Sequence, residues 1–480
     1  MTNPEFRRNL WLELSPQRLA LMVGVLGVIA ALTVYLSDNL TKEGGMARAL
    51  LIVFSALGLL LAGGWGSFTA MASINSEVAE RTWDQQRLSA LSPWQMAWGK
   101  LLGASIYPWL GSLICAAVVL VSGLMLPNGH APRLILLLLS AIMGCLALHC
   151  WIMASFLHTM DAHASNNGSS SIVKRLVGLF VLLQIVPTLL IAIIGLGTYN
   201  AKQSLITWWR WQLGLSSLCL LMSGLALALG LLAMWRSMCT QLMVRTTPWA
   251  WAVGCTAAGL IVAGFANDPH AAFLWPALVA GVALIATYFA LFTEKNNGTT
   301  WRAVVFHARQ GNWKRMLQTL PLWPVSWLLA LLFALLYTGL AESAIHDTFQ
   351  TQFAPLIHQG RSQILWMFVL RALRDAGIYL FFAWRNTQRK PLGMTLLTYV
   401  MLGSVLPLFF TGDHQQWASL FEPMSGAGIE AFINHVEQGA TFFRPLAWLA
   451  MMAHLAIVGA LLVWRWKQSV QLPPESLAAH

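Results

Sequence analysis

The sequence predicts an all-α membrane protein that crosses the bilayer about twelve times. Of its 480 residues, 57% are hydrophobic and only 10% are charged, whereas soluble domains carry about 25% charged residues. The 24 Trp and 22 Phe residues are typical of aromatic belts at membrane interfaces. In a soluble protein the net charge of +11 would suggest a nucleic-acid partner. Here the distribution of basic residues across the membrane explains it better, so no nucleic acid is expected.

Apolar runs of about 20 residues, the length that a spanning helix needs, recur along the chain. They occupy residues 19–37, 49–73, 102–126, 133–157, 174–196, 208–234, 249–266, 271–292, 322–340, 363–383, 392–410 and 445–464. The seventh and eighth runs are the weakest. Only Asn267 to His270 separates them, so we expect a tight helical hairpin.

The lysines and arginines set the orientation of these spans. With a cytoplasmic N-terminus, 20 of them fall in inside segments and seven in outside segments, while Arg371 and Arg374 remain within a span. Cytoplasmic loops carry the excess of basic residues. Both termini are therefore expected in the cytoplasm.

The spans form two sets of six, in residues 1–245 and 246–480. In each half a long basic cytoplasmic segment follows the second span, at residues 75–100 and 293–324. In these segments Trp83 aligns with Trp313, and after a one-residue slip Leu91 aligns with Leu320 and Trp94 with Trp323. The pattern indicates two fused six-helix units, the second a degenerate repeat. Chance similarity between two amphipathic helices is the alternative.

Asn75–Lys100 is longer than a chain reversal requires, and it mixes acidic and basic residues between two apolar runs. A helix of this kind, parallel to the membrane, could be a lever that a soluble motor protein grips. An interfacial amphipathic helix with solvated charges is the alternative. The chain has no GxxxxGK[ST] phosphate-binding loop, so we expect it to be no enzyme, with ATP hydrolysis in a partner chain.

Two stretches of the first half resemble ABC transporter permeases of the type-2 exporter class. NPEFRRNLWLELSPQR at residues 3–18 is similar to the family's N-terminal cytoplasmic helix. Residues 77–100 are similar to its loop between the second and third helices, at positions Glu77, Thr82, Leu88, Leu91, Ser92, Pro93, Gly99 and Lys100. The resemblance covers about residues 1–245 and is loose from residue 249 onward. Twelve spans depart from typical members, which have six and work as dimers.

The resemblance implies a permease subunit of the bacterial inner membrane that exports a substrate. ATP and Mg²⁺ would bind to a separate cytoplasmic ATP-binding subunit, in two copies, and this chain itself would bind no cofactor and hold no catalytic residue. The residues expected to couple to that subunit are Glu77, Arg81, Thr82, Trp83, Asp84, Arg87, Leu88, Pro93, Lys100, Arg309, Trp313, Lys314 and Arg315. Membrane lipids, a second permease copy and periplasmic accessory proteins are further candidate partners.

The basic run Arg302–Arg315 has two interpretations. Its cations and aromatic residues could bind anionic lipid headgroups, or they could dock a second copy of the ATPase. The Trp residues around Arg210 (Trp208, Trp209 and Trp211) are interpreted as part of an interfacial belt.

Arg371, Arg374 and Asp375 lie inside the span expected at 363–383. Intramembrane charges are costly and often mark a transport pathway, here one that would contact an anionic substrate group. Arg371 and Asp375 are four residues apart and can pair on one helix face. A structural ion pair between helices, or a shorter span with these residues near its cytoplasmic end, is the alternative.

Two other functions remain open. An ion-coupled secondary transporter would depend on Asp375, and a lipid-modifying membrane enzyme would depend on Asp413, His414 and Glu422 in the outside loop at 411–444. No metal site is expected, because no pair of outside histidines has the helical spacing of metal ligands. The six cysteines lie in or beside apolar runs, so no extracytoplasmic disulfide framework is expected.

Overall fold

The computed structural model describes residues 3–40, 45–80, 88, 91–126, 131–163, 205–266, 274–294, 296–348, 354–384, 391–406 and 445–470. The chain divides into two compact units, Met1–Thr246 and Thr247–His480. The second unit begins beside residue 246, where the sequence places the start of its second half. The repeat between the halves and their assignment as permease domains stay predictions.

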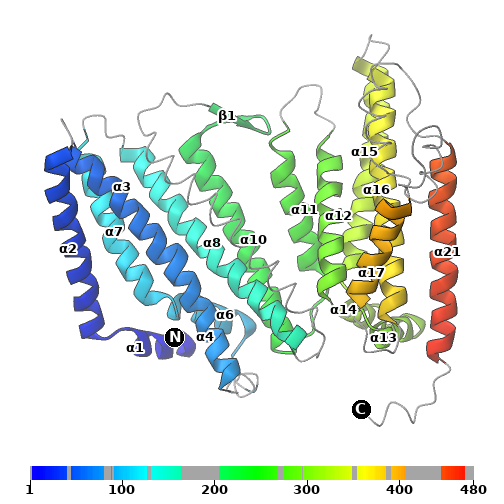
Figure 1. Cartoon of the computed structure of the whole chain (residues 1–480), viewed down its shortest axis with the longest axis horizontal. Coiled ribbons are helices and arrows are strands. Elements are labelled where there is room, and N and C mark those ends of the chain that lie inside the picture. Colours follow the sequence, from blue (N-terminus) through cyan, green and yellow to red (C-terminus); the bar gives the residue numbers. More distant parts are fainter. Residues whose placement is uncertain are drawn as a thin grey trace. The chain divides into compact units, whose positions relative to one another are not determined.

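Unit 1 is almost entirely helical in the part that the structure describes. Its helices are α1 (Pro4–Glu13), α2 (Pro16–Leu40), α3 (Gly45–Leu59), α4 (Gly66–Ala79), α6 (Pro93–Gly103), α7 (Ile106–Leu124), α8 (Ala131–His163) and α10 (Leu215–Gln241). The π-helical stretch η1 (Leu60–Trp65) joins α3 to α4, and the strands β1 (Leu205–Trp208) and β2 (Trp211–Gly214) precede α10. Figure 1 shows α1 running across the end of the unit at which α2 starts and α4 finishes.

Unit 2 consists of helices and short connections in its described residues. Its helices are α11 (Trp249–Ala263), α12 (Trp275–Thr293), α13 (Gly298–Arg309), α14 (Trp313–Thr319), α15 (Trp323–Thr348), α16 (Ala354–Ala383), α17 (Pro391–Val400), the π-helical η3 (Met401–Val405) and α21 (Pro445–Val470). Figure 1 shows α13 and α14 at the end of the unit where α12 finishes.

Eight of the described helices are long and apolar enough to cross a membrane. They contain Pro16–Ser37, Gly45–Glu77, Ile106–Leu124, Pro132–Leu157, Leu215–Gln241, Trp275–Thr293, Trp323–Leu340 and Ala447–Gln468. Each overlaps an expected span. The prediction of an all-α protein that crosses the membrane several times is confirmed.

The other four expected spans stand differently. Residues 249–266 form α11, which has only 15 residues. Residues 363–383 lie in α16, which carries several charged side chains and is not among the eight helices named above. The span at 392–410 begins as α17 and η3 and then continues beyond the described residues. The span at 174–196 lies wholly outside them, so the number twelve stays a prediction.

The boundary predicted at residue 208 was wrong, because α10 begins at Leu215. The preceding residues form an antiparallel hairpin in which Ile206 pairs with Leu213 and Trp208 with Trp211. Branched and aromatic residues favour strands, and the two paired indole rings lie with centroids 6.0 Å apart. A stretch that is apolar enough for a span therefore folds as a hairpin.

The boundary predicted at residue 102 was also wrong. The structure has two helices there, α6 and α7, which are separated at Ala104 and Ser105. Pro108 lies in the first turn of α7, and its nitrogen carries no hydrogen for a bond to the preceding turn. One continuous helix through this stretch is therefore disfavoured.

Small residues bring the helices of unit 2 close together. The core between α12, α15 and α16 contains Ala280, Ala283, Ala330, Ala334 and Ala372. At Gly259 of α11, a Cβ atom would lie 2.8 Å from the Cα of Val279 in α12. Such contacts are typical of helix packing in membranes, and they place α11 and α12 side by side.

Candidate functional site

The segment that the sequence singles out, Asn75–Lys100, ends in a well-capped helix. The hydroxyl of Ser92 accepts a hydrogen bond from the backbone N–H of Gln95 at 3.2 Å, and the side-chain oxygen of Gln95 accepts one from the N–H of Ser92 at 3.0 Å. This is a complete capping box. Pro93 occupies the first turn of α6, where its missing N–H costs nothing, so α6 begins sharply at this point.

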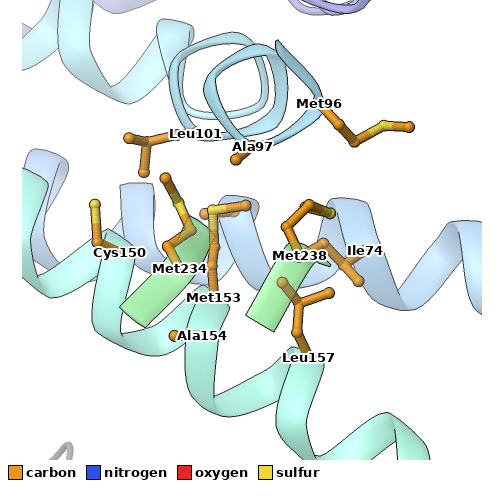
Figure 2. Packing of buried hydrophobic residues seen from close by; sticks show 11 residues of the cluster. Ile74, Met96, Ala97, Leu101, Cys150, Met153, Ala154, Leu157, Met234 and Met238 are labelled. Carbon is orange, nitrogen blue, oxygen red and sulfur yellow. The ribbon is translucent and has the colours of Figure 1, made fainter. Parts of the chain in front are cut away.

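One face of α6 is bound to three membrane helices by a methionine-rich core. Met96, Ala97 and Leu101 of α6 pack against α4, α8 and α10. The partner residues are Ala70, Ile74, Cys150, Met153, Ala154, Leu157, Met234 and Met238. Figure 2 shows α6 on one side of this core and the residues of α8 and α10 on the other. Methionine side chains adapt to irregular gaps, so this packing tolerates small displacements of α6.

A second face of α6 carries α1. A Cβ atom on Gly99 would lie 2.6 Å from the Cβ of Glu5, and one on Gly103 would lie 2.7 Å from the Cβ of Asn9. Only glycine leaves room for this approach. The Asn9 side-chain amide also donates a hydrogen bond to the carbonyl oxygen of Gly99 at 3.5 Å. The pair Gly99 and Gly103 therefore forms a small-residue surface on which α1 docks.

Four charged side chains from α1, α4 and α6 form an ion cluster at this junction. The ammonium group of Lys100 donates to Glu5 Oε1 at 3.2 Å and to Glu77 Oε2. The guanidinium of Arg8 donates to Glu77 Oε1 at 2.6 Å and to Glu5 Oε1 at 3.1 Å. The exposed fractions of Lys100, Glu5 and Glu77 are 0%, 6% and 7%.

Because two acids alternate with two bases, the cluster is neutral as a whole. Each buried charge therefore has opposite charges as partners, which is the condition for burying it. Glu77 lies just before the described end of α4, and Lys100 lies in α6. The cluster thus connects the two ends of the singled-out segment to each other and to α1.

Of the residues predicted to couple to a partner in this segment, Glu77 and Lys100 are thus internal, Pro93 starts α6, and the side chain of Leu88 is 88% exposed. Arg81, Thr82, Trp83, Asp84 and Arg87 lie outside the described residues. Sequence reasoning missed Glu5 and Arg8. Their signal was an acid and a base three positions apart in the N-terminal helix, opposite the pair Gly99 and Gly103.

The long segment of unit 2 is also joined at its ends. The Glu294 carboxylate accepts a hydrogen bond from the backbone N–H of Leu322 at 2.7 Å. The indole of Trp323 donates to the side-chain oxygen of Asn296 at 3.1 Å. These bonds hold the chain leaving α12 against the chain entering α15.

The predicted coupling residues of unit 2 lie on α13 and α14, between these joined ends. Arg309 ends α13, and Trp313, Lys314 and Arg315 lie on α14. All four are exposed. The Asn312 side chain caps α14 by accepting from the N–H of Arg315 at 3.2 Å. The four residues therefore lie exposed around the connection between α13 and α14.

The three charges predicted inside a span form a second buried cluster, in unit 2. The Arg374 guanidinium donates to Asp375 Oδ1 at 2.9 Å, and the Tyr288 hydroxyl donates to Asp375 Oδ2 at 2.8 Å. Arg371 lies farther away, with its Nε 3.8 Å from Asp375 Oδ2. The Tyr399 hydroxyl donates to the backbone oxygen of Asp375 at 2.9 Å. The Asp375 carboxylate is thus bonded within a contact between α12, α16 and α17.

Within the described residues, no group of three or more His, Cys, Asp or Glu side chains is arranged to hold a metal ion. All six cysteines are free. The residues on which a lipid-modifying enzyme would depend, Asp413, His414 and Glu422, lie outside the described part of the chain.

In comparisons with known proteins, no family model, curated protein or solved structure matches the chain. The structure itself shows a helical architecture with several candidate spans, the ion cluster around Lys100, and exposed basic residues on α13 and α14.

Proposed function

We propose that this chain is the membrane-spanning permease subunit of an ABC transporter of the type-2 exporter class, in the bacterial inner membrane with both termini cytoplasmic. The observation that carries the proposal is the ion cluster of Glu5, Arg8, Glu77 and Lys100. It joins both ends of the 75–100 segment to α1. A partner that displaces this segment would displace α1, α4 and α6 together.

The motion would pass from α6 into the membrane through the methionine-rich core. That core connects α6 to α4, α8 and α10, and α4 continues through η1 into α3. The imidazole of His149 in α8 bonds the carbonyl oxygen of Ala62 in η1 at 2.7 Å. Since π-helical stretches are frequent at functional sites, η1 is the place where this long helix would adjust.

The transport cycle then follows by alternating access. Two copies of a cytoplasmic ATP-binding subunit bind ATP and Mg²⁺, close, and press on the 75–100 segment and on α13 and α14. The helices rearrange, and a substrate moves outward or into the outer leaflet. This chain contributes the pathway and the docking surfaces, and the partner contributes the chemistry.

The test is copurification with an ATPase. The full chain is crosslinked in its own host and purified, and a bound protein with a phosphate-binding loop is identified by mass spectrometry and assayed for ATP hydrolysis. The pair Asp84→Lys with Arg87→Glu reverses charges in the first segment and should abolish copurification while the chain stays folded by size-exclusion chromatography. The double variant Lys314→Glu with Arg315→Glu tests in the same way whether the ATPase docks on the second segment.

The result that would overturn the proposal is transport by the purified chain in vesicles with no ATPase present. If only the Asp84→Lys with Arg87→Glu variant loses the ATPase, the ATPase docks on residues 75–100. If both double variants lose it, the ATPase docks on both segments. Retention of the ATPase in both would contradict docking at either segment.

An ion-coupled secondary transporter is the second candidate, because Asp375 lies in α16, within a span expected from the sequence, and is only 3% exposed. Such carboxylates often carry protons in transporters. The bonds of Asp375 to Arg374 and Tyr288 favour a structural role instead, since a proton would have to displace an existing partner. If Asp375→Asn abolishes transport and a collapsed proton gradient does the same without ATPase, the second candidate is correct.

A further inference from the structure

Several buried side-chain nitrogens of unit 2 have no hydrogen-bond partner among the described residues, and three of them are the indole and guanidinium N–H groups of α13 and of the residue that follows α16. These three are the indole Nε1 of Trp301, the Nε of Arg302 and the indole Nε1 of Trp384. Buried donors are nearly always bonded in folded proteins, and an exception calls for an explanation such as a bound ion or water. These three donors come from α13 and from the residue that follows α16.

Two of these side chains approach the same point, at Gly298. A Cβ atom on Gly298 would lie 3.9 Å from Cδ1 of Trp384 and 4.0 Å from Nη2 of Arg302. Gly298, Trp301 and Arg302 are at positions i, i+3 and i+4 of α13, so they share one helix face. The three donors therefore adjoin the first turn of α13.

The position along the membrane helices points to the headgroup layer. Trp384 directly follows the end of α16 at Ala383, and Gly298 follows the end of α12 at Thr293 by five residues. The ends of spanning helices lie near the lipid phosphates, where indole side chains also concentrate. The three donors therefore lie at the depth of the lipid phosphates.

The local charge selects an anion. Residues 298–319 contain Arg302, Arg309, Lys314 and Arg315 and no Asp or Glu. The nearby acid Glu294 already accepts from the N–H of Leu322. A water molecule would leave this positive charge without compensation, whereas an anionic headgroup supplies both acceptor oxygens and charge.

We infer that Trp301, Arg302 and Trp384 bind the phosphate of an anionic phospholipid in the leaflet that α13 faces. A guanidinium can present two parallel N–H groups to a phosphate, and an indole N–H is only a donor. Arg302 supplies the charge and the two indoles orient the phosphate. The basic residues of α14 add long-range attraction without contacting it.

Native mass spectrometry of the full chain in a nonionic detergent tests this inference. The probes are phosphatidylglycerol, phosphatidylcholine with the same acyl chains, and inorganic phosphate. We expect phosphatidylglycerol to bind at least about tenfold more tightly than phosphatidylcholine, a ratio that corresponds to one good charge-assisted hydrogen bond. Arg302→Gln should remove most of this preference.

Conservative variants separate the site from general folding and from diffuse charge. Trp301→Phe and Trp384→Phe keep an aromatic ring at each position and remove one donor each, so each should reduce the preference while the variant still unfolds in one cooperative transition. Arg309→Gln and Arg315→Gln remove exposed cations of the same segment and should leave most of the preference for phosphatidylglycerol. Equal binding of the two lipids, an equal loss in Arg309→Gln, or inorganic phosphate binding as tightly as phosphatidylglycerol would each overturn the inference.

Discussion

At the scale of single residues, Lys100 holds the most informative position in unit 1. The sequence identified Lys100 and Glu77 as significant, since both match the loop pattern of the permease family. It could not reveal that they touch, because residues 23 positions apart meet only after α4 and α6 have packed. Nor could it include Glu5, whose pairing with Lys100 spans 95 positions.

The burial of Lys100 makes a clear prediction about stability. In Lys100→Met two buried carboxylates, Glu5 and Glu77, lose the ammonium group that bonds them both. Breaking a buried ion pair by removing one member typically costs about 3–5 kcal/mol. We expect a clearly lower melting temperature for the purified variant in detergent, measured by intrinsic fluorescence.

The double variant Lys100→Met with Glu77→Gln removes one charge of each sign, so it should recover part of the loss. Lys314→Met, at an exposed lysine of α14, is the matched control and should melt like the unaltered protein. If Lys100→Met also melts at the unaltered temperature, the ion cluster does not hold these helices together.

At the scale of elements, the two ends of each long segment are held together, but the bonds differ between the units. In unit 1 the ends are joined by the ion cluster, and in unit 2 by Glu294 with Leu322 and Asn296 with Trp323. The sequence predicted two segments in matching places from their composition. It could not predict how the ends are joined, because backbone N–H groups such as that of Leu322 leave no trace in a residue pattern.

The docking of α1 on α6 is an element-scale feature that depends on two glycines. Gly99→Ala and Gly103→Ala each place a methyl group within 2.7 Å of α1 side chains, and overpacking of this kind typically costs about 1–3 kcal/mol. We expect α1 to detach more often and trypsin to cut faster at Arg7 and Arg8, measured by loss of an N-terminal tag. Cleavage in a helix reports such local opening.

Gly144→Ala is the control for that experiment. A Cβ atom at Gly144 meets nothing within 4 Å, so the tag should be lost no faster than in the unaltered protein. Unchanged cleavage in both Gly99→Ala and Gly103→Ala would mean that α1 is held by something other than this close contact.

At the scale of the whole molecule, apolar run length predicted most of the membrane helices and failed in two informative places. Residues 208–214 begin an expected span, but Trp208 and Trp211 pair across a hairpin. Residues 102–105 are apolar, but a break before Pro108 separates α6 from α7. Hydropathy measures how a segment partitions into lipid, and neither strand pairing nor a proline-linked break enters that quantity.

The crossing number depends most on α11, whose 15 residues give a length of about 22 Å against a hydrocarbon core of about 30 Å. Because α11 packs closely on α12 at Gly259, we expect it to cross with local thinning of the bilayer. Three crossings, α10, α11 and α12, would then separate the hairpin turn at Arg210 from Gln310 after α13.

Single cysteines at these two exposed positions test that count, in a variant whose six native cysteines are replaced. Arg210→Cys should react with a membrane-impermeant maleimide in intact cells, and Gln310→Cys only after the membrane is permeabilised. With α11 crossing, the number of spans between the two positions is odd, so the labels must appear on opposite sides. Labelling of both positions from one side would place α11 on the surface and reduce the expected twelve spans by one.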